Sequence, residues 1–106
     1  MSITAAQFRD LAMSLGGVTE KPHFDRLAFS VARTFATIAA DQNSANLLFT
    51  PEQQEGRCAI EPGIFAPVPN KWAAHGWTTL TFANADEVTS RAALKDAWNN
   101  SHKKKT

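Results

Sequence analysis

The sequence predicts an α+β fold, in which an antiparallel sheet of about five strands carries three helices packed mainly on one face. Helix-capping patterns followed by apolar residues at helical spacing occur near the start, the middle and the end of the chain. Elsewhere, apolar and polar residues alternate in short runs separated by turn residues. The loops between these runs are too short for a parallel crossover, so neighbouring strands must be antiparallel.

The first helix is predicted over residues 5–14. Thr4 and Gln7 form a capping-box pattern ahead of apolar residues at helical spacing. Gly16 and Gly17 end the helix, because glycine accepts the left-handed conformation that closes a helix.

Four short strands are expected next, because the apolar period changes from helical to alternating at Val18. They are the segments 18–24, 27–31, 35–40 and 45–49. Two- and three-residue turns connect them, which predicts a meander.

The second helix is predicted over residues 51–60, with Thr50 as its cap, Pro51 in its first position and Gln53 as capping-box partner. Prolines punctuate residues 61–70, and since proline cannot continue a helix we expect an ordered loop there.

The fifth strand is predicted over residues 77–82, and the third helix over 85–99 with Asn84 and Glu87 as its cap pattern. The stripe expected to lie on the sheet consists of Val88, Ala92, Leu94 and Trp98, whereas Arg91, Lys95 and Asp96 are expected to face outward. Trp98 is therefore predicted to be a core residue.

The 106 residues, of which 43% are hydrophobic and 20% charged, predict one globular domain spanning 1–106. No apolar run reaches the roughly 20 residues of a membrane span, and the first ten residues lack the order of a secretory signal. The single cysteine, Cys58, cannot form an internal disulfide. We therefore expect a cytoplasmic protein.

The distribution of charge along the sequence indicates how strongly the protein could bind nucleic acid. The net charge of +1 includes Lys103, Lys104 and Lys105, without which it is −2. Residues 103–106 are expected to be a frayed basic tail. A slightly acidic body argues against strong, sequence-independent binding to duplex DNA, although a local cationic patch remains compatible with it.

No catalytic or metal-binding constellation is recognisable. The histidines His23, His75 and His102 and the lone Cys58 lack the spacing of metal ligands or of a nucleophile with its base. Gly16-Gly17 follows a helix instead of linking a strand to a helix, so it does not predict a phosphate loop. We expect no enzyme activity, no metal and no cofactor.

Trp72 and Trp77 bracket a tight segment that is expected to be a turn. In one interpretation both indoles pin this loop to the domain. In the other, one indole joins Lys71 and His75 in a surface on which a base or a partner side chain stacks.

Two groups of residues together resemble the MmcQ/YjbR family. The first comprises residues 15–24, 28–31 and 35–38, and the second comprises 62–72 and 76–80. The resemblance covers nearly the whole chain and implies a bacterial protein with a CyaY-like α+β fold, commonly labelled DNA-binding, without enzyme activity or cofactor. The chain has Asp25 where the family tends to have glycine, and a less basic segment at 73–75.

The functional expectation is a non-enzymatic module that binds nucleic acid weakly through phosphate contacts. The candidate site residues are Lys21, His23, Arg26, Arg33, Lys71, Trp72, His75 and Trp77. Their cationic members either gather into a patch at the turns or are scattered solubility charges. The alternative is a protein-interaction module, similar to secretion-chaperone folds, that uses the open sheet face or a dimer contact.

Overall fold

The computed structural model describes residues 2–102, so the predicted basic tail at 103–106 lies outside the described residues. The elements are α1 (Ala5–Met13), β1 (Thr19–His23), β2 (Arg26–Ser30), β3 (Thr34–Ile38), β4 (Ser44–Leu48), α2 (Pro51–Ile60), β5 (Phe65–Pro67), η1 (Lys71–His75), β6 (Trp77–Thr81), η2 (Phe82–Asn84) and α3 (Glu87–His102), where η marks a 3-10 helix. No helix among residues 2–102 has both the length and the apolar character that crossing a bilayer requires.

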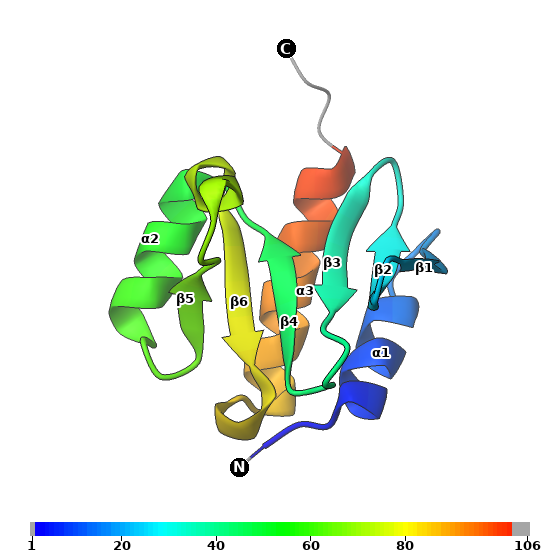
Figure 1. Ribbon diagram of the computed structural model, residues 1–106, viewed down its shortest axis with the longest axis horizontal. Helices are drawn as coiled ribbons and strands as arrows, with labels where there is room; N and C mark the ends of the chain where they lie inside the picture. Colours follow the sequence, from blue (N-terminus) through cyan, green and yellow to red (C-terminus); the bar gives the residue numbers. More distant parts are fainter. Residues whose placement is uncertain (1, 103–106) are drawn as a thin grey trace.

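Within residues 2–102 the strands form one six-stranded antiparallel sheet in the order β1-β2-β3-β4-β6-β5 (Figure 1). The predicted meander of four strands is confirmed, and each strand begins and ends within two residues of its expected bounds. Both predicted capping boxes are also present, at Thr4 with Gln7 and at Thr50 with Gln53.

The expected loop at 61–70 contains the additional strand, β5. Phe65 pairs with Leu80 and Pro67 with Thr78 of β6, so the prediction of a loop was wrong for these three residues. β5 is an edge strand, where proline is tolerated because its missing N–H can face away from the ladder. Because prolines interrupt the apolar alternation in this segment, its sequence did not indicate the short strand.

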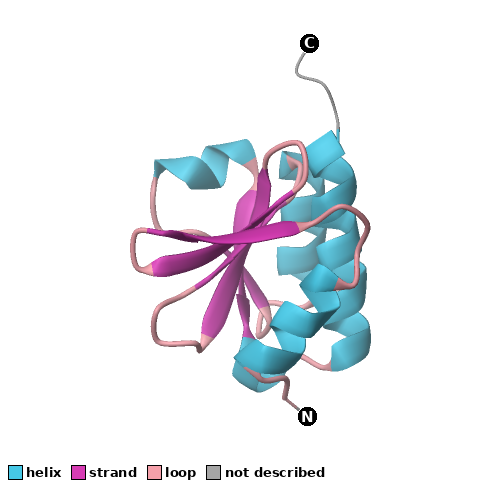
Figure 2. Cartoon of the chain, turned by 90° about the vertical axis from the view of Figure 1, so that its right-hand side faces the viewer, coloured by secondary structure: helices cyan, strands magenta, loops and turns pink. Residues whose placement is uncertain are grey.

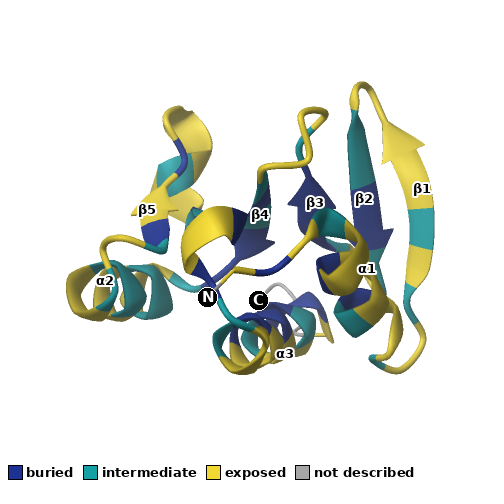
Figure 3. Cartoon of the chain, turned by 90° about the horizontal axis from the view of Figure 1, so that it is seen from below, coloured by how far each residue is buried: buried dark blue, intermediate teal, exposed yellow. Residues whose placement is uncertain are grey.

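All three helices lie on one side of the sheet, as predicted (Figures 2 and 3). Alternate strand residues point toward them, and Phe29, Leu47 and Leu80 from β2, β4 and β6 are fully buried there. Phe8 of α1 and Leu94 of α3 belong to the same core. Within residues 2–102 no α-helix lies on the opposite face of the sheet, where only the short 3-10 helix η1 stands at one end.

Helix α3 begins two residues later than expected because η2 precedes it. Its cap is Asp86, whose Oδ1 accepts a hydrogen bond from the Thr89 N–H at 2.7 Å. Asn84, the predicted cap, instead donates from Nδ2 to the Gly63 carbonyl at 2.7 Å. The predicted capping residue was therefore wrong.

The predicted apolar stripe of α3 is only partly correct. Leu94 is buried, but Val88 is 78% exposed and Ala92 is also exposed. Trp98 lies half-buried at the edge of the core, where its Nε1 donates to the Gly16 carbonyl at 2.9 Å. The buried positions are Ser90, Ala93, Leu94, Ala97, Asn100 and Ser101. Three of these buried side chains are polar, so the positions of the large apolar residues do not identify the face of α3 that lies against the sheet.

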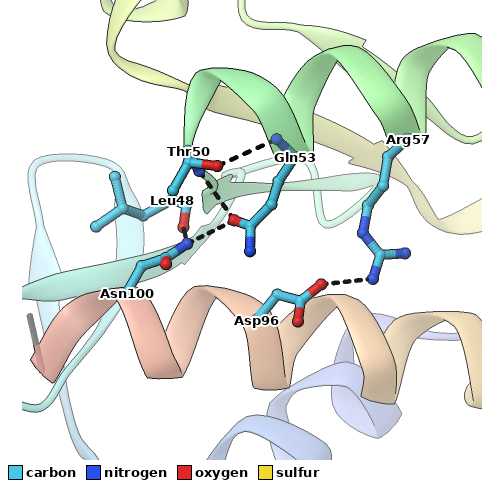
Figure 4. A network of polar contacts seen from close by, with 6 residues as sticks. All are labelled: Leu48, Thr50, Gln53, Arg57, Asp96 and Asn100. Carbon is cyan, nitrogen blue, oxygen red and sulfur yellow. Dashed lines mark hydrogen bonds and ion pairs between the residues drawn. The ribbon is translucent and has the colours of Figure 1, made fainter.

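A polar seam joins α2 to α3 (Figure 4). Asn100 donates from Nδ2 to the Leu48 carbonyl at 2.9 Å and to Gln53 Oε1 at 2.8 Å. Arg57 donates to Asp96 at 2.7 Å. Helix α2 has no buried residue of its own and packs mainly against β5 and β6, and these polar contacts link it in addition to α3.

Candidate functional site

Polar side chains cross the open face of the sheet in register. Thr37 of β3 lies opposite Asn46 of β4, which lies opposite Thr79 of β6. Thr79 Oγ1 donates to Asn46 Oδ1 at 2.8 Å. At the β1–β2 end, His23 is paired with Arg26. The face therefore carries hydroxyl, amide and cationic groups where the helix-covered face carries hydrocarbon.

A shallow cleft of about 300 Å³ lies on this face. It gathers four of the eight predicted site residues: His23, Arg26, Trp72 and Trp77. The remaining lining residues are Thr34, Thr37, Asn46, Val68 and Asn70. Among residues 2–102 no carboxylate lines this cleft, so its fixed charge is positive.

Arg26 is the principal cation of the cleft. Its Nε donates to Thr37 Oγ1 at 2.8 Å, whereas Nη2 is buried and has no hydrogen-bond partner among residues 2–102. Burial lowers the pKa of this guanidinium, and the nearby charges of Asp25 and Asp41 oppose that shift. A buried donor without an acceptor costs about 1–3 kcal/mol, and because this Nη2 has almost no exposed surface, an incoming oxygen reaches it only if the side chain moves.

The turn η1 holds Trp72 at the rim of the cleft. Asn70 begins it, since its Oδ1 accepts from the Trp72 N–H at 2.9 Å. Gln54 of α2 donates from Nε2 to the Ala73 carbonyl at 3.0 Å and to the Trp77 carbonyl at 2.9 Å. One glutamine side chain thus fixes both ends of the segment that the two tryptophans bracket.

Gly76 ends η1 with a φ of 99°, a conformation that residues with a side chain rarely adopt. A Cβ added at this position would lie 1.9 Å from the Phe49 carbonyl oxygen, far inside van der Waals contact. The turn therefore packs against the backbone that joins β4 to α2, and only glycine permits that approach.

The two tryptophans differ in burial. Trp77 is half-buried and packs against the core, in agreement with the anchoring interpretation. Trp72 is 53% exposed, and its ring centre lies 5.6 Å from that of His75. Trp72 therefore presents an aromatic surface to solvent beside the cleft.

The predicted cations do not form one patch at the turns. Arg33 lies beyond the far end of β2 from Arg26, and its Nη2 donates to the Asn100 carbonyl at 3.4 Å. Lys21 lies on the open face, opposite Ala28, and Lys71 is exposed on η1 next to Trp72. Lys21 and Lys71 thus flank the cleft without lining it, whereas Arg33 caps the carboxyl end of α3.

Phe24 was not among the predicted site residues. It is 93% exposed at the tip of the β1–β2 hairpin and adopts a φ of 58°. A bulky residue in the left-handed region is an outlier, and glycine is the usual occupant of such hairpin positions. The sequence prediction placed Phe24 at the end of the strand 18–24, whereas the structure places it in the two-residue turn after β1.

The polar residues Thr34, Thr37, Asn46 and Asn70 were also missed. They come from three segments, β3, β4 and the start of η1, which only the tertiary structure brings together. Among residues 2–102 there is no group of three or more His, Cys, Asp or Glu side chains that could hold a metal ion. Cys58 is half-buried, and burial raises the pKa of its thiol, which disfavours the nucleophilic thiolate.

Comparison with known proteins agrees with this architecture. The fold is similar to that of a Deinococcus radiodurans protein with a DUF419 domain, at 22% identity and a TM-score of 0.77, over 90% of this chain and 75% of that one. It is also similar to a Pseudomonas syringae protein, at 14% identity and a TM-score of 0.72, over 94% of this chain and 100% of that one. No curated protein matches the sequence. The YjbR family model matches residues 13–102, and the chain therefore belongs to the YjbR family.

Proposed function

We propose that this protein is a non-enzymatic cytoplasmic module that binds nucleic acid weakly through phosphate contacts on the open sheet face. The observation that carries the proposal is the cleft: Arg26 lines it as a cation, and no carboxylate among residues 2–102 does. A guanidinium is well suited to phosphate oxygens.

Two exposed lysines extend this positive surface. Lys21 lies on the same face of the sheet as Arg26, and Lys71 lies on η1 next to Trp72. Together with Arg26 they give about three phosphate contacts. For a single strand, a plot of the logarithm of the association constant against the logarithm of the salt concentration should then have a slope of about −2. The affinity should then fall about 20-fold between 50 and 200 mM salt.

A fluorescence-anisotropy titration with labelled oligonucleotides at these two salt concentrations tests the proposal. The double variant Lys21→Gln and Lys71→Gln should weaken binding and flatten the salt dependence. Lys95→Gln is the matched control, since Lys95 is exposed on α3, on the other side of the sheet. An absence of binding to any oligonucleotide at 50 mM salt would refute the proposal.

Arg26→Met tests the central contact. Methionine keeps much of the side-chain volume and removes both the charge and the buried, unpartnered Nη2. The variant should fold as well as the natural protein and bind at least fivefold more weakly.

A protein partner is the second candidate, and the exposure of Phe24 favours it, because exposed large apolar side chains occur at contact surfaces. An apolar contact would be nearly insensitive to salt. Binding of a polypeptide that Phe24→Ala abolishes and that 200 mM salt leaves unchanged would support this candidate over nucleic acid.

A further inference from the structure

We infer that the cleft between the β1–β2 hairpin and η1 receives one unpaired base, so that the partner is single-stranded nucleic acid and not a duplex. This inference rests on the proposed function and adds to it the strand state of the partner. The phosphate contacts alone make no such distinction, since both forms carry phosphates.

The size of the cleft is the first argument. Its volume of about 300 Å³ is at the lower end of the range for small-molecule sites. The base pairs of a duplex are stacked inside it and do not offer one free base to such a hollow, whereas an unpaired base has an exposed face and edge. The cleft therefore fits a single base in size.

The aromatic lining is the second argument. Trp72 is 53% exposed at the cleft, and its turn is held by Gln54 and by the close approach of Gly76 to Phe49. Because the backbone that carries this indole is already held, little backbone freedom is lost when a base stacks on it. Stacking on aromatic side chains is the usual means by which proteins hold single strands without reading sequence.

The polar lining is the third argument. Asn46 and Asn70 bring amides to the cleft, Thr34 and Thr37 bring hydroxyls, and Arg26 brings a guanidinium. The side-chain oxygens of Asn46, Asn70 and Thr37 already accept hydrogen bonds within the domain, so the amide and hydroxyl hydrogens are the donors that remain. These groups match the acceptors of a base edge and the oxygens of its phosphate. In Figure 1 the sheet is seen from this open face, with α3 behind β4.

The test compares a labelled 12-nucleotide single strand with the matched 12-base-pair duplex, at 50 mM salt, for the natural protein and two Trp72 variants. We expect the single strand to bind at least tenfold more tightly than the duplex. Trp72→Ala should weaken single-strand binding about 10-fold or more, because stacking on one aromatic ring contributes about 1–3 kcal/mol by alanine substitution. Trp72→Phe, which retains a ring, should remain within about threefold of the natural protein.

The salt dependence separates stacking from charge. Trp72→Ala should leave the salt slope unchanged, whereas Lys71→Gln should make it shallower by about 0.7. Thermal melts of both Trp72 variants confirm that the compared proteins are folded.

Failure of this inference can be told apart from failure of the proposed function. Duplex binding as tight as that of the single strand, with no effect of Trp72→Ala on either, would overturn the base-binding inference and leave phosphate-driven binding intact. An absence of binding to both forms at 50 mM salt would overturn both.

Discussion

The two sides of the sheet hold their polar groups differently. On the helix side, Asn100 donates two hydrogen bonds, to Leu48 and Gln53, and Arg57 is paired with Asp96 (Figure 4), although Asn100 Oδ1 and Ser90 Oγ are buried without a partner in residues 2–102. On the open side, Arg26 has one hydrogen bond through Nε and a buried Nη2 without a partner in residues 2–102.

This difference indicates which polar groups stabilise the fold and which remain able to contact a partner. A polar group that is paired inside the domain stabilises it only while its partner is present, and removing one partner is costly. A buried donor without a partner costs free energy, so its removal is tolerated. Polar substitutions on the helix side should therefore change stability, whereas those on the open side should change binding.

The largest effect is expected from Gly76→Ala, because the added Cβ would lie 1.9 Å from the Phe49 carbonyl oxygen in a backbone of φ 99°. The free energy of unfolding should fall by at least about 3 kcal/mol, as measured by guanidinium denaturation followed by circular dichroism. Gly63→Ala is the matched control, since a Cβ there meets nothing within 4 Å. Equal stability of the two variants would contradict the close packing of η1 on the β4–α2 junction.

Asn100→Ala should lower the free energy of unfolding by about 1.5 kcal/mol, because the buried Leu48 carbonyl loses its side-chain donor. Asn99→Ala, at an exposed position on the same helix, should change it by less than about 0.5 kcal/mol. The same denaturation measurement checks both. A loss confined to the Asn99 variant would show that the polar seam does not attach α2 to α3.

Phe24→Gly should raise the free energy of unfolding by about 0.5 kcal/mol, since glycine relieves the left-handed conformation at a side chain that is 93% exposed. Phe24→Ala removes the ring but keeps a Cβ in the same conformation, so it should not stabilise the domain. Thermal melts of the two variants, compared side by side, separate backbone strain from loss of the ring. A destabilised glycine variant would mean that the ring supports the hairpin.

The smallest effect concerns pH. Hydrogen bonds from the backbone N–H and then the side chain of Thr89 hold the pKa of Asp86 below its ordinary value of 3.8. The stabilisation from this carboxylate is therefore complete above the pKa of the unfolded chain and is lost as the pH falls through the folded-state pKa. Asp86→Asn keeps a capping oxygen without titrating, so its melting temperature should fall less between pH 5 and about 3.

Glu20 titrates in the same direction, because its hydrogen bond with Arg9 lowers its pKa. It is unchanged in the Asp86→Asn variant, so the difference between the two melting curves reports Asp86 alone. Parallel curves across this pH range would exclude Asp86 as the titrating cap of α3.

The sequence alone determined the elements whose cause is local. The capping boxes at Thr4 and Thr50 begin α1 and α2, because each needs only residues three positions apart. Period-two alternation and short turns gave the four-stranded meander for the same reason. The resemblance to the family that residues 13–102 match is likewise a property of the sequence itself.

Tertiary structure decided whatever depends on residues distant in the chain. Strand β5 exists because residues 65–67 pair with β6. The buried face of α3 is set by distant partners, since Asn100 donates to the Leu48 carbonyl and Ser101 to the Arg33 carbonyl. The cleft likewise joins Arg26 to Trp72 across β3, β4 and β6, and Arg33 is separated from Arg26 by the length of β2. Local patterns specify which residues alternate, but only the strand register specifies which of them become neighbours, because hydrogen-bonded pairing acts between segments and not within them.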